Sequence, residues 1–206
     1  MSRLLFQLAE WITRLAYLNL LWLTFTFLGF VIFGFFPATI STFAIIRKWI
    51  KGQTDLPIFK TFWSIFRQEF IKANGYGLII SIVGGLSYTH LVFLSLHRDS
   101  NLLFVQFPLY LFLFFALLTL LYLFPVYVHY NLGFFTVIKQ AFLLMLIHPL
   151  HNIAMLIGIS LTIFVFNYIP GLTFFFAGSF IAFLLMGTCY QIFQSIEEKQ
   201  QNRTAS

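Results

Sequence analysis

The 206 residues of this chain are 60% hydrophobic and only 9% charged, and the mean hydropathy is +0.91. A soluble domain carries about 25% charged residues, and its helices keep a polar face, so this composition indicates an integral membrane protein. The formal charge of +6 does not indicate nucleic-acid binding, because the cations flank apolar runs and do not line an aromatic-studded polar surface.

An amphipathic segment, residues 3–14, leads into the first long apolar run. Trp11 and Tyr17 lie where interfacial aromatic side chains are common. The apolar run begins late after Arg3, and no A-x-A cleavage site follows it. We therefore expect no cleaved signal peptide.

The first apolar run, residues 15–46, is uncharged and too long for one straight span. As a single helix at 1.5 Å per residue it would extend about 48 Å, against a hydrocarbon core of about 30 Å. The run has to break where Gly29, Gly34 and Pro37 lie, because proline removes a backbone donor and clashes with the preceding turn. We place the structural break at Gly34 and Pro37. A span over residues 12–33 would then be followed by a shorter, partly embedded helix over residues 38–50.

The shorter helix ends in cations that indicate topology. By the positive-inside rule, Arg47, Lys48 and Lys51 lie in the cytoplasm, and the return of the chain keeps its N-terminus there too. A five-span topology with an external N-terminus is the alternative. The basic stretch over residues 47–72 is the predicted cytoplasmic loop.

A basic amphipathic helix is predicted within this loop. Asp55 can cap a helix that begins near Pro57. Helices of this kind typically lie in the membrane interface, where each cation near anionic lipid contributes about 1 kcal/mol. We expect either an interfacial connector or a docking surface for a partner. The aromatic side chains that recur on one face are Phe59, Phe62, Trp63, Phe66 and Phe70.

The next predicted span, residues 76–96, carries small residues at four-residue spacing, Gly77, Ser81 and Gly85. Such spacing lets two helices approach closely, and the neighbouring helix belongs either to this chain or to another subunit. A short outer loop is expected to follow at His97, Arg98 and Asp99.

The following span, residues 102–128, is long enough to tilt or to kink at Pro108 or Pro125. Residues 134–147, which include Lys139, are predicted to form an inner interfacial or partly embedded helix.

Two further spans complete the predicted topology, over residues 150–167 and 172–193, with a turn at Pro170 and Gly171. A polar tail begins at Ser195 and is expected to be cytoplasmic and frayed at its end.

These elements predict an all-α, polytopic transmembrane helical bundle. It has five long membrane helices, a short proline-broken sixth segment and a basic amphipathic cytoplasmic helix. Residues 1–195 form one transmembrane domain and residues 196–206 a short cytoplasmic tail. The expected location is the cell membrane, with multiple passes and both termini in the cytoplasm.

The sequence offers few residues that could act as catalytic acids, bases or metal ligands within the membrane. The acidic residues fall in loops or chain ends, so paired-carboxylate catalysis and carboxylate metal sites are not expected. His148 and His151 could share a helix face, but Pro149 separates them and no third ligand is nearby, so capping or interfacial roles are expected. His90 and His129 lie near span ends, where they can reach headgroups or carbonyls.

Other functional signatures are also weak. Cys189 is the one cysteine, so an intramolecular disulfide is impossible and a thiolate metal cluster is not expected. We therefore expect no cofactor and no metal. The 30 phenylalanines suit lipid contact and helix packing, because a sugar-stacking channel would need polar partners. The candidates for such partners are Gln106, Asn131, Asn152, Asn167 and Gln191.

Three segments of the first 75 residues resemble the YesL-like family of bacterial membrane proteins, a family of unknown function. They are E-W-I-T-R-L-A-Y-L-N-L-L-W at residues 10–22, G-F-F-P-A-T-I-S-T-F-A-I-I-R-K-W-I-K-G at residues 34–52 and F-K-T-F-W-S-I-F-R-Q-E-F-I-K-A-N at residues 59–74. The resemblance implies a protein of this size from Gram-positive bacteria, encoded beside carbohydrate ABC importers and two-component regulators of sugar use. It implies no catalytic residues.

We therefore expect a non-enzymatic accessory or scaffold membrane protein associated with a carbohydrate ABC importer. Its expected partners are membrane lipids and either importer permease subunits or a second copy of the chain, and not nucleic acid. An autonomous small-solute transporter is the alternative, and a membrane enzyme acting on lipid or glycan is a third hypothesis. The candidate contact residues are Arg47, Lys48, Trp49, Lys51, Lys60, Trp63, Arg67, Gly77, Ser81 and Gly85.

Overall fold

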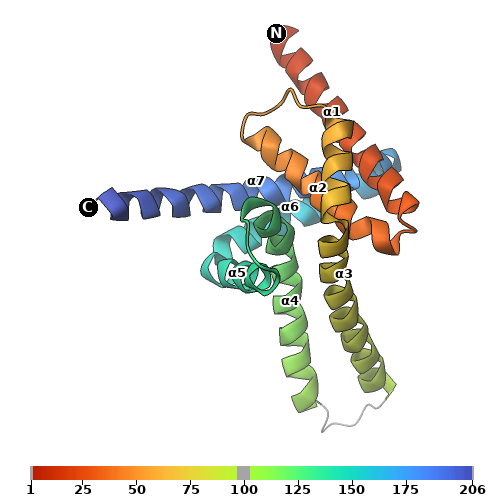
Figure 1. Cartoon of the computed structure of the whole chain (residues 1–206). Coiled ribbons are helices and arrows are strands. Elements are labelled where there is room, and N and C mark those ends of the chain that lie inside the picture. Colours follow the sequence, from red (N-terminus) through yellow and green to blue (C-terminus); the bar gives the residue numbers. More distant parts are fainter. Residues whose placement is uncertain (1, 97–102, 206) are drawn as a thin grey trace.

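The computed structural model describes residues 2–96 and 103–205, and the predicted loop at His97, Arg98 and Asp99 lies outside them. Within the described residues the chain is all-α and forms seven helices (Figure 1). They are α1 (Ser2–Leu28), α2 (Ile32–Ile50), α3 (Ile58–Leu96), α4 (Leu103–His129), α5 (Phe134–Ile147), α6 (Pro149–Tyr168) and α7 (Pro170–Ala205).

The chain reverses between α1 and α2 in a tight turn over residues 29–31. Phe30 and Val31 have positive φ angles of 54° and 65°, which are unfavourable for residues with a Cβ. A Cβ at Gly34 would lie 2.5 Å from the carbonyl oxygens of both Phe25 and Thr26. The hairpin therefore requires glycine at position 34, because any side chain there would separate α1 from α2.

The predicted break is present, but it lies at residues 29–31, which begin at Gly29, and not at Gly34 and Pro37. Pro37 lies inside α2, and the preceding helix already ends at Leu28. A proline at this position deprives the Phe33 carbonyl of its helical donor. Asn74 of α3 replaces that donor, because its Nδ2 donates to the Phe33 carbonyl oxygen at 3.0 Å. The helix therefore continues through the proline.

The predicted basic helix and the span after it are one helix. α3 is continuous over 39 residues and would be about 58 Å long at 1.5 Å per residue, longer than the hydrocarbon core. The sequence predicted one helix ending before Tyr76 and another starting there, but α3 has no break at this point. Gly75 and Gly77 do not end the helix, because a glycine inside a helix costs only about 1 kcal/mol. A change in hydropathy does not end a helix.

The C-terminal half follows the sequence more closely. α5 has the predicted bounds, and Pro149 occupies the first turn of α6, where its missing N–H costs little. α7 begins at Pro170 but continues to Ala205, so the tail expected from Ser195 is helical in the described residues.

Four helices in the described part of the chain are long and apolar enough to cross a membrane: α3, α4, α6 and α7. α5 is a shorter apolar helix. α1 was predicted as a fifth long span but is not among them, since Arg14 and Asn19 interrupt its apolar sequence. The four helices are not all parallel or antiparallel to one another: α7 runs across the direction of α3 and α4 (Figure 1).

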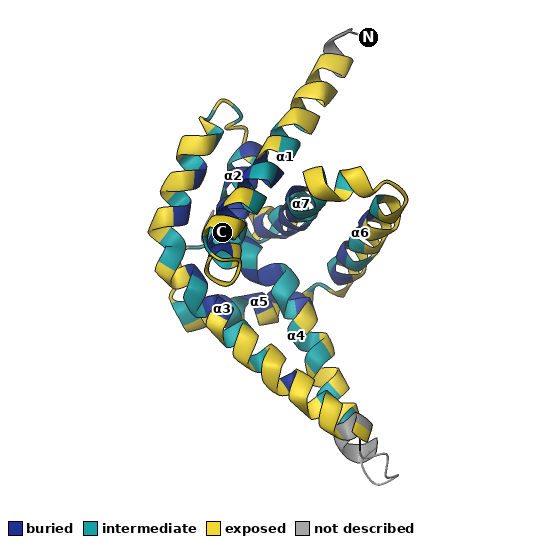
Figure 2. Ribbon diagram, turned by 90° about the vertical axis from the view of Figure 1, so that its right-hand side faces the viewer, coloured by how far each residue is buried: buried dark blue, intermediate teal, exposed yellow. Residues whose placement is uncertain are grey.

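The buried core takes side chains from all seven helices and lies where they converge (Figure 2). Asn19 of α1 is only 1% exposed, and its Nδ2 donates to the Phe174 carbonyl oxygen of α7 at 2.7 Å. Its Oδ1 accepts from the backbone N–H groups of Gly178 and Ser179 at 2.9 and 3.0 Å. This side chain fastens α1 to α7 with directional contacts that the apolar core does not provide.

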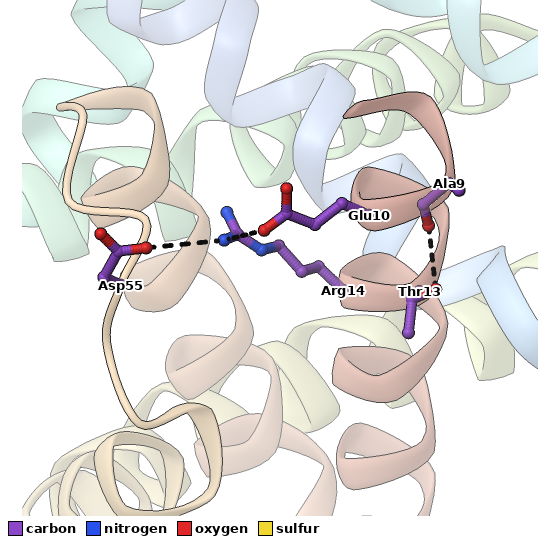
Figure 3. A network of polar contacts seen from close by, with 5 residues as sticks. All are labelled: Ala9, Glu10, Thr13, Arg14 and Asp55. Atoms are coloured by element: carbon purple, nitrogen blue, oxygen red, sulfur yellow. Dashed lines mark hydrogen bonds and ion pairs between the residues drawn. The ribbon is translucent and has the colours of Figure 1, made fainter. Parts of the chain in front are cut away.

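A charged contact holds the connection between α2 and α3 against α1 (Figure 3). The Arg14 guanidinium lies 2.5 Å from a Glu10 carboxylate oxygen and 3.8 Å from one of Asp55. It also lies over the Trp11 ring, 5.9 Å from its centroid. The predicted cap by Asp55 is wrong: in the described residues this carboxylate contacts Arg14 and makes no hydrogen bond to the start of α3.

Candidate functional site

A polar cavity of about 570 Å³ lies between α2, α3, the end of α4 and the connection that follows α4. Its apolar lining includes Ile40, Ala44 and Phe134. Its polar lining consists of Arg47, Gln68, Glu69, Lys72, Tyr76, Tyr127, His129, Tyr130 and Asn131.

Helix geometry explains how these side chains converge. On α3, Glu69, Lys72 and Tyr76 recur at i, i+3 and i+7, which places them on one face. Arg47 lies in the last turn of α2, and Tyr127 lies near the end of α4. The cavity therefore forms where the ends of two helices meet one face of a third.

The carboxylate in the cavity already has a partner. The Tyr127 hydroxyl donates a short hydrogen bond to Glu69 Oε2. The Tyr76 hydroxyl donates to the Phe134 carbonyl oxygen at 3.1 Å, and the two rings stack with centroids 4.0 Å apart. Tyr76 and Phe134 thus form a fixed aromatic wall on one side of the cavity.

Two buried groups at the α7 side of the cavity lack part of their hydrogen bonding. His129 is only 4% exposed, and its Nε2 lies 3.1 Å from Glu197 Oε1 of α7. Its Nδ1 and the Arg47 Nε are buried and have no hydrogen-bond partner in the described residues. Burial lowers the pKa of the Arg47 guanidinium, and nearby Tyr190 and Glu197 oppose that shift. An arginine nevertheless stays charged in proteins.

The residues that line the cavity include two cations, Arg47 and Lys72, and one carboxylate, Glu69, so the lining has one more positive than negative charge. Arg47 and Lys72 form no salt bridge with any described residue, while Glu69 is engaged by Tyr127. Unpaired cationic donors beside amide donors suit an anionic ligand group. The described residues include no group of three His, Cys, Asp or Glu that could hold a metal ion.

A second cavity, of about 600 Å³ and almost wholly apolar, lies between α3, α4 and α5. It adjoins the polar cavity, because Tyr76 lines both. Its residues on α3 and α4 include Ile80, Gly84, Phe112 and Leu120.

The predicted contact residues fall into four groups. Arg47 lines the polar cavity, while Trp49 is buried against Trp11 with ring centroids 5.9 Å apart. Gly77 is buried in this chain, because a Cβ there would lie 2.3 Å from the Phe36 ring. Trp49 and Gly77 therefore cannot contact a partner. Lys48 is half-buried, and the exposed group is Lys51, Lys60, Trp63, Arg67, Ser81 and Gly85.

The aromatic face of the predicted amphipathic helix is divided. Phe62 and Phe66 are buried around Phe25 of α1, each with ring centroids 5.1 Å apart from it. Phe59 and Trp63 remain exposed. α1 therefore covers much of the face that the sequence assigned to the interface.

Of the predicted histidines, His148 is a capping residue. Its Nδ1 donates to the Leu144 carbonyl oxygen at 3.0 Å, at the end of α5. The His151 ring lies beside it, with centroids 5.5 Å apart.

Sequence reasoning missed the pairing of Glu69 with Tyr127. The two residues are 58 positions apart, and hydropathy gives no sign that they meet. The i, i+3, i+7 pattern of polar residues on α3 was visible in the sequence and could have indicated one wall of the cavity.

The long apolar helices make this chain a multi-pass helical membrane protein. It belongs to the YesL-like family. The family described as "Protein of unknown function, DUF624" matches residues 15–91, which include the α1–α2 hairpin and the basic half of α3.

Three Bacillus subtilis (strain 168) proteins, all described as uncharacterized, are similar along nearly their whole length. YteU is 35% identical over 93% of this chain and 86% of its own, and YesV is 35% identical over 91% and 90%. YesL is 30% identical over 95% of this chain and 92% of its own. No solved structure is significantly similar to this chain.

Proposed function

We propose that this protein is a non-enzymatic accessory or scaffold membrane protein that docks on the membrane subunits of a carbohydrate ABC importer. One observation carries the proposal: α3 presents an exposed stripe at helical spacing, in two parts that are separated by Asn74, which is half-buried and contacts α2. The stripe consists of Lys60, Trp63, Arg67, Ile71, Leu78, Ser81 and Gly85.

The stripe changes character along the helix in a way that suits a membrane partner. Its first part carries the cations Lys60 and Arg67, whereas its second part is apolar and ends in the small residues Ser81 and Gly85. Apart from the adjoining residues and backbone of its own helix, no described atom lies within 4 Å of the position that a Gly85 Cβ would occupy. Small residues with free space let another helix approach closely within a bilayer.

The proposed partner and the proposed docking surface are supported by different observations. The association with a carbohydrate importer is suggested by the family resemblance, while the docking surface is suggested by α3. We further propose that the chain has both termini in the cytoplasm and that α2 is only partly embedded, with Lys51 on the cytoplasmic side.

The test is affinity purification from native membranes in mild detergent, followed by mass spectrometry of all co-purifying proteins. The wild-type chain should recover importer permease subunits in near-stoichiometric amount. Gly85→Leu should lose them, because its side chain occupies the stripe. Gly84→Leu is the matched control, since Gly84 has equal free space but lines the apolar cavity.

Three results would contradict the proposal. The first is recovery of the chain alone as a monomer, together with unchanged sugar uptake in cells that lack it. The second is equal recovery of the permease subunits with wild type and Gly85→Leu. The third is equal loss with Gly84→Leu, which would mean that any added bulk on α3 disturbs the complex.

A transporter acting alone is the second candidate function. It is favoured by the polar cavity of about 570 Å³ between helix ends. This function predicts solute flux in liposomes that contain only this chain. Absence of flux for sugars and small anions would argue against it.

A further inference from the structure

We propose that the polar cavity and the apolar cavity together bind one anionic glycerophospholipid. Its phosphate would lie between Arg47 and Lys72, and its acyl chains would lie between α3 and α4. Neither the family description nor the accessory function above assigns such a site.

The two cavities are aligned along the same two helices. On α3 the polar cavity takes residues 65–76 and the apolar cavity residues 76–84. On α4 the polar cavity takes residues 127–129 and the apolar cavity residues 112–123. α3 and α4 run in opposite directions side by side (Figure 1), so both pass from polar to apolar lining in the same spatial direction. A ligand along them would need one polar and one apolar end.

The dimensions suit one lipid leaflet. The distance along α4 from Val128 in the polar cavity to Phe112 in the apolar cavity is about 24 Å at 1.5 Å per residue. One leaflet with its headgroups is about 20–22 Å thick. Each cavity is also within the range of about 300–1,000 Å³ that is usual for small-molecule sites.

The charges select an anionic headgroup. Arg47 and Lys72 make no salt bridge to any residue that the structure describes, and the nearby Glu69 accepts from Tyr127. The guanidinium geometry matches phosphate oxygens, and lysine adds a point charge. Unsatisfied buried polar atoms are uncommon in native proteins, and the Arg47 Nε and His129 Nδ1 are two of them. A phosphate group would provide an acceptor for the arginine.

The apolar cavity argues for a lipid in preference to a free anion. A soluble phosphate compound would contact only the polar cavity and leave the space beside Gly84 and Phe112 unused. Apart from Tyr76, Thr119 and Lys139, the residues that line this space are apolar, which suits lipid chains. Tyr76 lines both cavities, and its ring, stacked on Phe134, lies where headgroup and chains would meet.

The experiment uses the full chain, purified in a maltoside detergent and stripped of native lipid, with native mass spectrometry as the readout. Dioleoyl phosphatidylglycerol is the anionic probe, and dioleoyl phosphatidylcholine supplies the same chains with a zwitterionic headgroup. Glycerol phosphate supplies the anionic headgroup without chains. We expect the phosphatidylglycerol to bind about tenfold to thirtyfold more tightly than the phosphatidylcholine, because two cations favour it. Glycerol phosphate should bind far more weakly than either.

Variants separate the two cavities. Arg47→Gln and Lys72→Gln should each reduce the preference for the anionic lipid several-fold. If Arg47→Gln does not fold, Lys72→Gln still tests the role of the cations. Gly84→Leu should weaken both lipids. The controls are Gly85→Leu and the double variant Lys60→Gln with Arg67→Gln, which removes two cations from the exposed stripe, one more than either cavity variant removes. These controls should bind as wild type.

Four outcomes would overturn the proposal. Equal affinity for phosphatidylglycerol and phosphatidylcholine would show that the cations do not select an anionic headgroup. Binding of glycerol phosphate as tight as that of the lipid would assign the site to a free anion. Loss of binding in the stripe controls as large as in the cavity variants would show a non-specific lipid annulus. A protein helix found cross-linked to position 84 in native membranes would assign the apolar cavity to a partner protein. None of these results depends on whether an importer is recovered.

Discussion

Asn74→Ala should destabilise the packing of α3 against α2, and Pro37→Ala in the same chain should remove most of that loss. The reason lies in one carbonyl group. Pro37 has no backbone N–H, so the Phe33 carbonyl oxygen four residues earlier has no donor from its own helix. Asn74 Nδ2 supplies a donor at 3.0 Å from another helix.

The expected size of the loss follows from known magnitudes. Hydrogen bonds between helices in a membrane protein contribute about 0.6 kcal/mol on average and at most about 1.7 kcal/mol. A polar group left without a partner in apolar surroundings costs about 1–3 kcal/mol. Asn74→Ala should therefore lower the free energy of unfolding by about 0.5–1.5 kcal/mol. With Pro37→Ala present, the restored N–H donates to Phe33, and the coupling between the two substitutions should account for most of that loss.

The assay is a double-mutant cycle on the purified chain, with unfolding followed by circular dichroism as denaturing detergent is added to mild detergent. Gln53→Ala, an exposed polar residue in the connection between α2 and α3, is the control and should change little. An equal loss from Asn74→Ala with and without Pro37 would refute the reasoning. Asn74 would then stabilise α3 in a way unrelated to the proline.

Three further predictions concern the core, the hairpin and the topology. Asn19→Leu leaves the Phe174 carbonyl and two N–H groups of α7 without the Asn19 side chain as partner. The free energy of unfolding should therefore fall by about 2 kcal/mol or more in the same assay. A decrease below about 0.5 kcal/mol would contradict this prediction. Gly34→Ala places a Cβ 2.5 Å from two carbonyl oxygens and should cost about 1–3 kcal/mol, whereas unchanged stability would show that the hairpin opens freely. Single cysteines at Ser2 and Asp55 in a Cys189→Ala background should both be shielded from an impermeant thiol reagent in intact cells. Labelling at Ser2 alone would favour the five-span topology.

Much of the fold follows from local sequence signals. The apolar runs indicated a helical membrane protein, and the prolines at positions 149 and 170 marked the starts of α6 and α7. The bounds of α5 were predicted correctly. These signals succeed because each acts through the backbone of the residues that carry it.

Two errors in the fold arise from contacts over long distances in sequence. The penalty at Pro37 is local, but its compensation comes from Asn74, which is 41 residues beyond the Phe33 carbonyl that it contacts. The Asp55 carboxylate was assigned to its own helix start, whereas the structure places it beside Arg14 of α1. The sequence shows that a group such as the Phe33 carbonyl loses its helical hydrogen-bond donor. It does not show which distant residue replaces that donor.

The candidate site was less predictable than the fold. The cations Arg47 and Lys72 were both seen as topology signals, and hydropathy could not show that one cavity contains them both. Trp49 was expected among the contact residues because it lies in the basic stretch over residues 47–72, yet its indole is buried against Trp11. Aromatic residues next to cations occur in interfaces and in cores alike, so composition does not distinguish the two.

The exposed stripe and the lipid-binding cavity are two faces of α3, and the helix geometry separates them. Successive residues on an α-helix are about 100° apart, so Gly84 lines the apolar cavity while Gly85 lies on the stripe. Both have free space at the Cβ position, so leucine at either position adds the same bulk to the same turn. Loss of partner only with Gly85→Leu and loss of lipid only with Gly84→Leu would assign each function to its own face. Loss of both with either substitution would contradict both proposals, because added bulk anywhere on this turn of α3 would then disturb partner and lipid alike.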